Sequence, residues 1–157
     1  MIRIVRSIET FATRLETAKQ RLIVDKCALR NASTSLREAE EALKNHISIS
    51  EEVARQFLQT FREYVNVEKE YEQIVSTQDA NAIDVANQRL YISANRKCEA
   101  HAKLTAVNKE LDNAENAVDN SLANYKEALD EFNSSEMEYT ITENCFQKAV
   151  DEFNGGV

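Results

Sequence analysis

Apolar residues recur along the chain at alternating intervals of three and four residues. Every seventh residue from Ile8 to Tyr71 is large and apolar except Ser50, and a second row lies three residues after each of them. Two such rows are the a and d positions of a heptad repeat (a to g) and are typical of a coiled coil. Because the phase does not slip between residues 4 and 74, we expect one long helix over residues 3–75.

A second heptad repeat begins at Ile83 and continues to Phe153. Its a row is apolar except for Lys97, and its d row consists mostly of Ala, Ser and Thr. This repeat predicts a second helix over residues 80–153. The Ser, Thr, Asp and Asn residues between 76 and 82 favour the end of one helix and the capping of the next, so we expect the turn there.

The sizes of the residues in the two repeats predict how the helices pair. If facing residues are those whose numbers sum to 157, large a residues meet small d residues, as in Leu43 with Ala114. Ser50, which is small, then meets Val107, the one sizeable aliphatic of the opposite row, as close packing requires. We therefore predict an all-α fold, a long antiparallel two-helix coiled-coil hairpin that forms a single elongated domain over residues 1–157.

Two features of this fold have alternatives. Polar residues between 45 and 52 resemble a helix cap, so a kink near 46–50 is the alternative to a continuous first helix. An antiparallel pairing between two chains would satisfy the same layers, although the short turn favours pairing within one chain. Beyond the single hairpin, we expect hairpins to pair with each other into a helical bundle.

Charge supports the antiparallel arrangement. Residues 1–37 contain eight Lys/Arg and three Asp/Glu, and they face residues 120–156, which contain two Lys and eight Asp/Glu. The register places Arg21 near Glu138. Each exposed pair contributes only about 0–1 kcal/mol, but together such pairs disfavour a parallel arrangement.

Apart from serine and threonine, three polar residues, Asp25, His46 and Lys97, interrupt the apolar seam. Buried polar groups in coiled coils often specify register or partner at some cost in stability, and we interpret these residues in that way. Alternatively, Asp25 and Lys97 mark places where another chain supplies a counter-charge.

The sequence contains no candidate catalytic, cofactor or metal site. His46 and His101 lie about 15 Å apart along the hairpin and cannot share an ion. Cys27, Cys98 and Cys145 do not face one another, and we expect surface thiols in a reducing compartment. A two-stranded coiled coil has no pocket that would desolvate a general acid or base. We therefore expect no enzyme activity, no cofactor and no metal.

The overall charge and hydropathy narrow the range of partners. The net charge is −8, without a basic stripe, which disfavours nucleic acid. No apolar stretch is long enough for a transmembrane helix, and the acidic surface disfavours binding to anionic lipid. The N-terminal segment resembles a transit peptide, but it is in phase with the repeat. We expect a protein of the cytoplasm or of an assembled particle, without a signal peptide.

One apolar surface is not needed for the pairing of the two helices. Apolar residues occupy e and b positions beside the seam on the turn-proximal half, and contiguous apolar area there usually indicates a further partner. A smaller patch, Leu122 and Leu129, lies nearer the termini. The candidate protein-binding residues of the larger surface are Ile47, Ala54, Leu58, Phe61 and Val65 of the first helix and Tyr91, Ala94 and Cys98 of the second.

The pattern favours a non-enzymatic structural or assembly protein. This would be a rigid coiled-coil rod that forms homo-oligomers or packs into a larger complex such as a virion, a filament or a secretion assembly. The alternative is an adaptor or export chaperone that binds a client protein through the same apolar residues. The expected architecture is similar in shape to the helical hairpins of secretion and flagellar export stalks, and a similarity of shape assigns no function.

Overall fold

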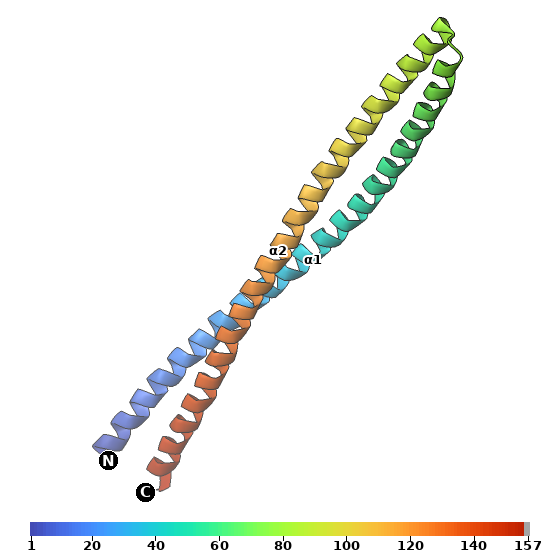
Figure 1. The fold of residues 1–157 in the computed structure, drawn as a ribbon. Helices are drawn as coiled ribbons and strands as arrows, with labels where there is room; N and C mark the ends of the chain where they lie inside the picture. Colours follow the sequence, from blue (N-terminus) through green and yellow to red (C-terminus); the bar gives the residue numbers. More distant parts are fainter. Residues whose placement is uncertain (156–157) are drawn as a thin grey trace. The chain divides into compact units, whose positions relative to one another are not determined.

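The structure, a computed structural model, describes residues 1–155 as two long helices joined by a short turn. Helix α1 spans Ile2–Ser76 and helix α2 spans Ala80–Gly155, and no strand occurs in residues 1–155. The two helices pack against each other as a helical hairpin, which confirms the predicted fold class (Figure 1). Residues 45–52 are helical without interruption, so the cap-like residues there do not end α1.

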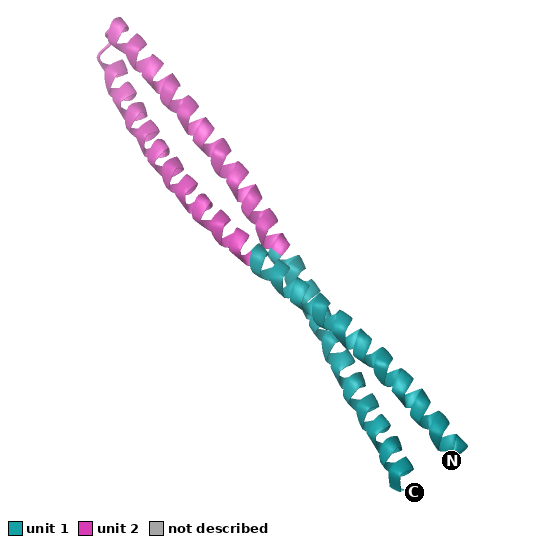
Figure 2. Cartoon of the chain, turned by 180° about the vertical axis from the view of Figure 1, so that it is seen from behind, with its two compact units in different colours: residues 1–39, 118–157 teal, residues 40–117 magenta. Residues whose placement is uncertain are grey.

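The hairpin divides into two compact units, each containing a segment of both helices (Figure 2). Unit 1 joins Met1–Ala39 with the part of α2 that begins at Val118, and unit 2 comprises Glu40–Ala117 and includes the turn. Both chain ends therefore belong to unit 1. A single domain over residues 1–157 and the pairing of hairpins into a bundle stay predictions.

The core of each unit is the predicted seam. Every a and d position from Ile8 to Phe153 is partly or fully buried. Small d side chains let the opposite helix approach closely, whereas two helices alone cannot surround the large a residues, which stay partly exposed. The fully buried residues of the described chain are all small d residues: Ala18, Ala86, Ala114, Ser135 and Ala149.

The turn consists of Thr77, Gln78 and Asp79, within the predicted range of 76–82. The Asp79 carboxylate accepts hydrogen bonds from the backbone N–H groups of Asn81 and Ala82, at 3.1 and 3.3 Å, and so caps the start of α2. Gln78 has a φ of 58°, the left-handed conformation that commonly follows the end of a helix. This conformation lets the chain reverse within three residues, but it is unfavourable for a residue with a Cβ atom.

Replacing Gln78 by glycine should stabilise the hairpin. Glycine adopts positive φ without the Cβ clash, and part of that gain is offset by the greater freedom of glycine in the unfolded chain. We expect Gln78→Gly to raise the free energy of unfolding by about 0.5–1 kcal/mol in chemical denaturation. The control is Asp79→Ala, which should lower it by about 1 kcal/mol because the α2 cap is lost. A destabilised Gln78→Gly variant would contradict this interpretation of the turn.

Contacts across the seam confirm the antiparallel register in both units. In unit 1, Arg21 Nη1 lies 2.6 Å from Glu138 Oε2, as the sequence predicted. In unit 2, the Ser50 hydroxyl donates to Asn108 Oδ1 at 3.3 Å, and the rings of Phe57 and His101 lie 5.8 Å apart. Each of these pairs lies within one helical turn of the predicted register.

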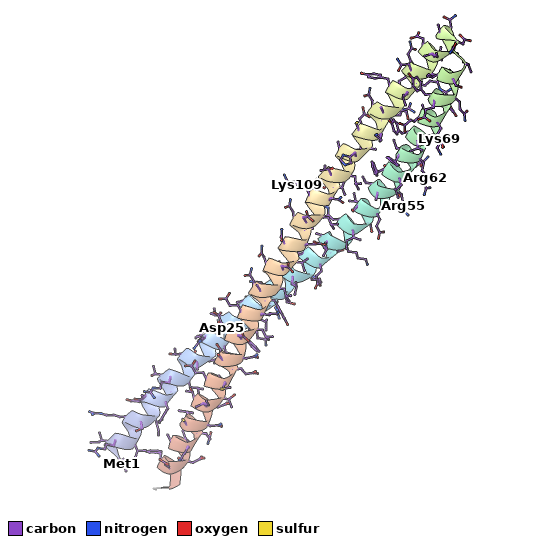
Figure 3. All side chains as sticks on the ribbon, in the orientation of Figure 1. Met1, Asp25, Arg55, Arg62, Lys69 and Lys109 are labelled. Carbon is purple, nitrogen blue, oxygen red and sulfur yellow. The ribbon has the colours of Figure 1, made fainter. Side chains whose placement is uncertain are left out.

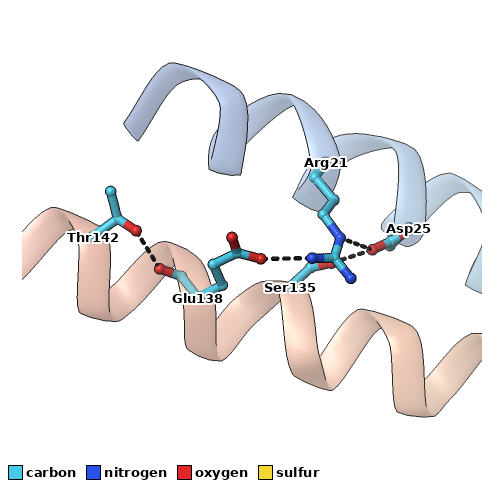
Figure 4. A network of polar contacts seen from close by, with 5 residues as sticks. All are labelled: Arg21, Asp25, Ser135, Glu138 and Thr142. Atoms are coloured by element: carbon cyan, nitrogen blue, oxygen red, sulfur yellow. Dashed lines mark hydrogen bonds and ion pairs between the residues drawn. The ribbon is translucent and has the colours of Figure 1, made fainter. Parts of the chain in front are cut away.

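The polar seam residue of unit 1, Asp25, is held by its own chain (Figure 4). The Ser135 hydroxyl donates a hydrogen bond to Asp25 Oδ2, and Arg21 Nε lies 3.7 Å from the same oxygen. Arg21 also pairs with Glu138, so one guanidinium joins two carboxylates across the helices. The alternative that Asp25 awaits a counter-charge from another chain is therefore unnecessary.

The two polar seam residues of unit 2 have different environments. The ammonium group of Lys97 lies 3.8 Å from the centre of the Tyr64 ring, a cation–π contact that compensates for its position in the seam. His46 is partly buried, and its Nδ1 atom has no hydrogen-bond partner. A polar atom without a partner costs stability, which fits a residue that marks register rather than one that strengthens the seam.

Candidate interaction surface

The predicted apolar surface lies within unit 2 and combines residues of both helices. We call its eight predicted residues the apolar flank. Ala54, Val65 and Ala94 are partly buried beside the seam, and the other five are exposed. The exposed fractions of the larger side chains are 69% for Tyr91, 51% for Leu58, 43% for Phe61 and 42% for Ile47.

The exposure of these residues follows from helix geometry. The e and b positions lie next to a around the helix, on the side away from d, so residues there line one side of the coiled coil. Two paired helices cover e only in part and b hardly at all. Apolar residues at b positions, such as Leu58 and Tyr91, therefore need a third element if they are to leave water.

A hollow of about 340 Å³ lies in the middle of the flank. The rings of Phe57 and Phe61 lie 6.1 Å apart, and Lys97, Cys98 and His101 complete the lining. His101 is exposed, and its ring packs on Phe57, a contact that the heptad pattern did not predict. The signal for this contact in the sequence is the e position of His101, next to the b position of Cys98. The hollow can accept one apolar side chain from a partner, the arrangement of most interaction hot spots.

The other side of unit 2 is charged. Glu70 pairs with Arg89 at 3.7 Å, and both residues occupy g positions. Arg89 also lines a hollow with Glu63 and Arg96, which are g residues of facing helices. Unit 2 is therefore asymmetric: one ion pair and further charged g residues line one side of the seam, and uncovered apolar side chains line the other.

A row of basic residues runs beside the apolar flank on α1. Arg55, Arg62 and Lys69 recur every seventh residue at f positions, next to the b positions of the flank, and Figure 3 shows them along the outer side of α1. Lys109 holds an f position on α2. The net charge of −8 does not reveal this local row of three basic residues.

The remaining candidate chemistry consists of isolated groups. All three cysteines are free and exposed, as predicted. In residues 1–155 no cluster of three or more His, Cys, Asp or Glu side chains has the geometry to hold a metal ion. Neither helix, as far as Gly155, contains an apolar stretch that could cross a membrane.

Comparisons of the chain with protein-family models, with curated proteins and with solved structures find no match.

Proposed function

We propose that this chain is a non-enzymatic structural protein that self-associates, and that the apolar flank of unit 2 is its contact surface. The observation that carries the proposal is the exposure of Leu58, Phe61 and Tyr91 on one side of the seam. Scattered apolar residues are normal on a protein surface, but a contiguous group around a hollow usually marks an interface.

The free energy gained by covering the apolar flank is enough only for a weak association. Complete burial of a large apolar side chain contributes about 1.5–3 kcal/mol, so covering the exposed half of one contributes about 1 kcal/mol. Covering four such residues on one copy and a similar apolar area on the other then contributes on the order of 8 kcal/mol. Association itself costs about 4–15 kcal/mol in lost freedom, so the flank alone supports only weak binding. A tight complex needs further contacts.

Replacing Leu58 and Phe61 together by glutamate should abolish self-association. Two carboxylates in the flank would have to lose their water on contact, which costs more than the apolar contact contributes. In sedimentation velocity over increasing concentration, the wild-type coefficient should rise and that of the double variant should stay at the monomer value. Circular dichroism should show equal helicity for both proteins, because both side chains are about half exposed.

The matched control is the double change Ile23→Glu and Val24→Glu on α1 of unit 1. These side chains are 53% and 64% exposed, so the control introduces the same charges at equally exposed apolar positions outside the flank. It should associate as the wild type does. A wild-type protein that stays monomeric at every concentration would refute self-association.

The same flank also suits the alternative function, an adaptor or export chaperone that binds a client protein. Crosslinking with mass spectrometry in the native context separates the two functions. Loss of wild-type self-crosslinks in the Leu58→Glu, Phe61→Glu variant supports self-association. Loss of one client's crosslinks with unchanged self-association supports the adaptor.

A further inference from the structure

The charges around the apolar flank indicate the character of its partner. Between residues 47 and 65 of α1 and 91 and 108 of α2, Glu51 is the only Asp, Glu, Lys or Arg at an e or b position. Arg62 and Lys109 lie beside this stretch and belong to no ion pair of residues 1–155, whereas Arg55 is paired with Glu52 at 2.8 Å. The flank therefore suits an apolar surface with carboxylates at its edges.

Such a surface exists on α2 in unit 1. Leu129, Asn133, Met137 and Ile141 follow one another at intervals of four residues and form a ridge along the outside of the helix, which we call the α2 ridge. Met137 is 66% exposed and Ile141 57% exposed. A shallow hollow lies between these two side chains. The smaller patch predicted from the sequence consists of Leu122 and Leu129. Leu129 belongs to the α2 ridge, and Leu122 lies one heptad before it.

Along α2 itself, the α2 ridge is bordered mainly by carboxylates. Lys126 is the one basic side chain among its close neighbours in the helix. Glu138 is already paired with Arg21, whereas the other acidic residues belong to no ion pair of residues 1–155. The acidic neighbours are Glu127, Asp130, Glu131, Glu136 and Glu138.

We propose that the α2 ridge of one copy docks on the apolar flank of a second copy. This inference rests on the proposed self-association and names the surface that the flank binds. Rows of side chains spaced four residues apart pack into the grooves of another helix, and Met137 is the flexible apolar side chain that fills the hollow beside Phe61. Asp130 and Glu136 then lie near the cations that border the flank.

A contact of flank with flank is disfavoured by the same charges. It would bring the Arg62 and Lys109 edges of two copies together, and a contact of ridge with ridge would bring carboxylates together. Docking of ridge on flank instead joins two different surfaces, so each copy keeps one free flank and one free ridge. Such a heterologous contact continues from copy to copy unless its symmetry closes it.

Complementation between two variants tests this geometry. The flank variant carries Leu58→Glu and Phe61→Glu, and the ridge variant carries Met137→Glu and Ile141→Glu. Each should be monomeric alone, at a concentration at which wild-type protein associates. A one-to-one mixture should form a heterodimer, because the intact ridge of the flank variant meets the intact flank of the ridge variant. Sedimentation velocity with one variant fluorescently labelled measures this directly.

The outcomes separate this inference from the proposed function. If wild-type protein associates and the flank variant does not, but the ridge variant associates normally, the flank binds another surface and the inference is overturned while self-association stands. A monomeric wild-type protein overturns both. The control with Ile23→Glu and Val24→Glu should behave as wild type, and all variants should retain wild-type helicity.

Charge reversal provides a second, independent readout. Arg62→Glu with Lys109→Glu should weaken association roughly fivefold, because two exposed ion pairs are lost and like charges meet. Asp130→Lys with Glu136→Lys on the other copy should restore it, and the restored complex should remain salt-dependent. If the changes at Arg62 and Lys109 weaken association and the changes at Asp130 and Glu136 do not restore it, these charged edges do not pair.

A basic row beside apolar side chains also suits binding to an anionic membrane surface. Co-sedimentation with phosphatidylserine vesicles tests for such binding. Wild-type binding to these vesicles that the flank variant lacks, with no heterodimer in the mixture, would overturn the docking of two copies.

Discussion

Replacing Leu43 by alanine should lower the free energy of unfolding by about 2 kcal/mol, and adding Ala114→Leu in the same chain should restore most of it. Leu43 is a partly buried a residue, and Ala114, the d residue that the predicted register places opposite it, is 8% exposed. The single change leaves a void in the seam, at the lower end of the usual range for buried leucine because this side chain is partly exposed. Ala114→Leu alone should cost about 1–3 kcal/mol by overpacking.

The protein already contains one layer with this exchange. Ser50 occupies an a position in unit 2 and the register places Val107 opposite it, so the larger side chain comes from α2. The Ser50 hydroxyl then reaches Asn108 instead of filling the seam. Exchanging Leu43 and Ala114 therefore reproduces an arrangement that the helices already accommodate. A full double-mutant cycle in chemical denaturation should show a coupling on the order of 3 kcal/mol, because the two single losses are largely absent from the double variant.

The control for this cycle is Leu58→Ala, which removes the same atoms from a side chain that is 51% exposed. Measured on dilute, monomeric protein, it should cost less than about 1 kcal/mol, because little surface leaves the solvent at that position. If the double exchange is as unstable as the sum of the two single changes, Leu43 and Ala114 do not face each other.

Replacing Ser135 by alanine should destabilise unit 1 by about 1–3 kcal/mol. The side chain of Asp25 is only 14% exposed, and the Ser135 hydroxyl is its hydrogen-bond donor from the opposite helix. Without that donor, the partly buried carboxylate keeps only the guanidinium of Arg21 at 3.7 Å. A buried acceptor that loses its partner retains its full desolvation cost.

Removing both polar groups should reverse this loss. Asp25→Leu combined with Ser135→Ala replaces a buried polar pair by apolar side chains, and such replacements are often neutral or stabilising by about 1–4 kcal/mol. We therefore expect the double variant to unfold at or above the wild-type denaturant concentration. Arg21→Met serves as the control and should cost no more than about 1 kcal/mol, since Arg21 and Glu138 are both 52% exposed. A double variant as unstable as Ser135→Ala would show that the network stabilises the seam.

The comparison of Asp25 with Lys97 shows what a heptad pattern can and cannot predict. Both were recognised as polar interruptions of the seam from their spacing alone. Their partners were not predicted, because Ser135 and Tyr64 reach them through side-chain conformations that spacing does not contain. The same holds for His101, whose ring turns onto Phe57.

The apolar flank and the basic row beside it show a second limit of the heptad pattern. Positions e and b of an isolated helix are recognisable from the sequence, and the eight flank residues were predicted in this way. The basic row of Arg55, Arg62 and Lys69 has the same seven-residue spacing, but summing charge over the chain concealed it. Charge has to be placed on a helix face before it indicates a partner.

The sequence by itself determined the helices, the turn and the register of this protein. A long helix without proline or internal glycine buries a strip of apolar residues that recurs every seven positions against a second helix, and large residues opposite small ones select one register. The tertiary structure decided which polar groups satisfy one another, as in the Asp25 network, and where two aromatic rings leave a hollow beside the seam. These features depend on side-chain directions at the meeting of two helices, which neither helix specifies alone.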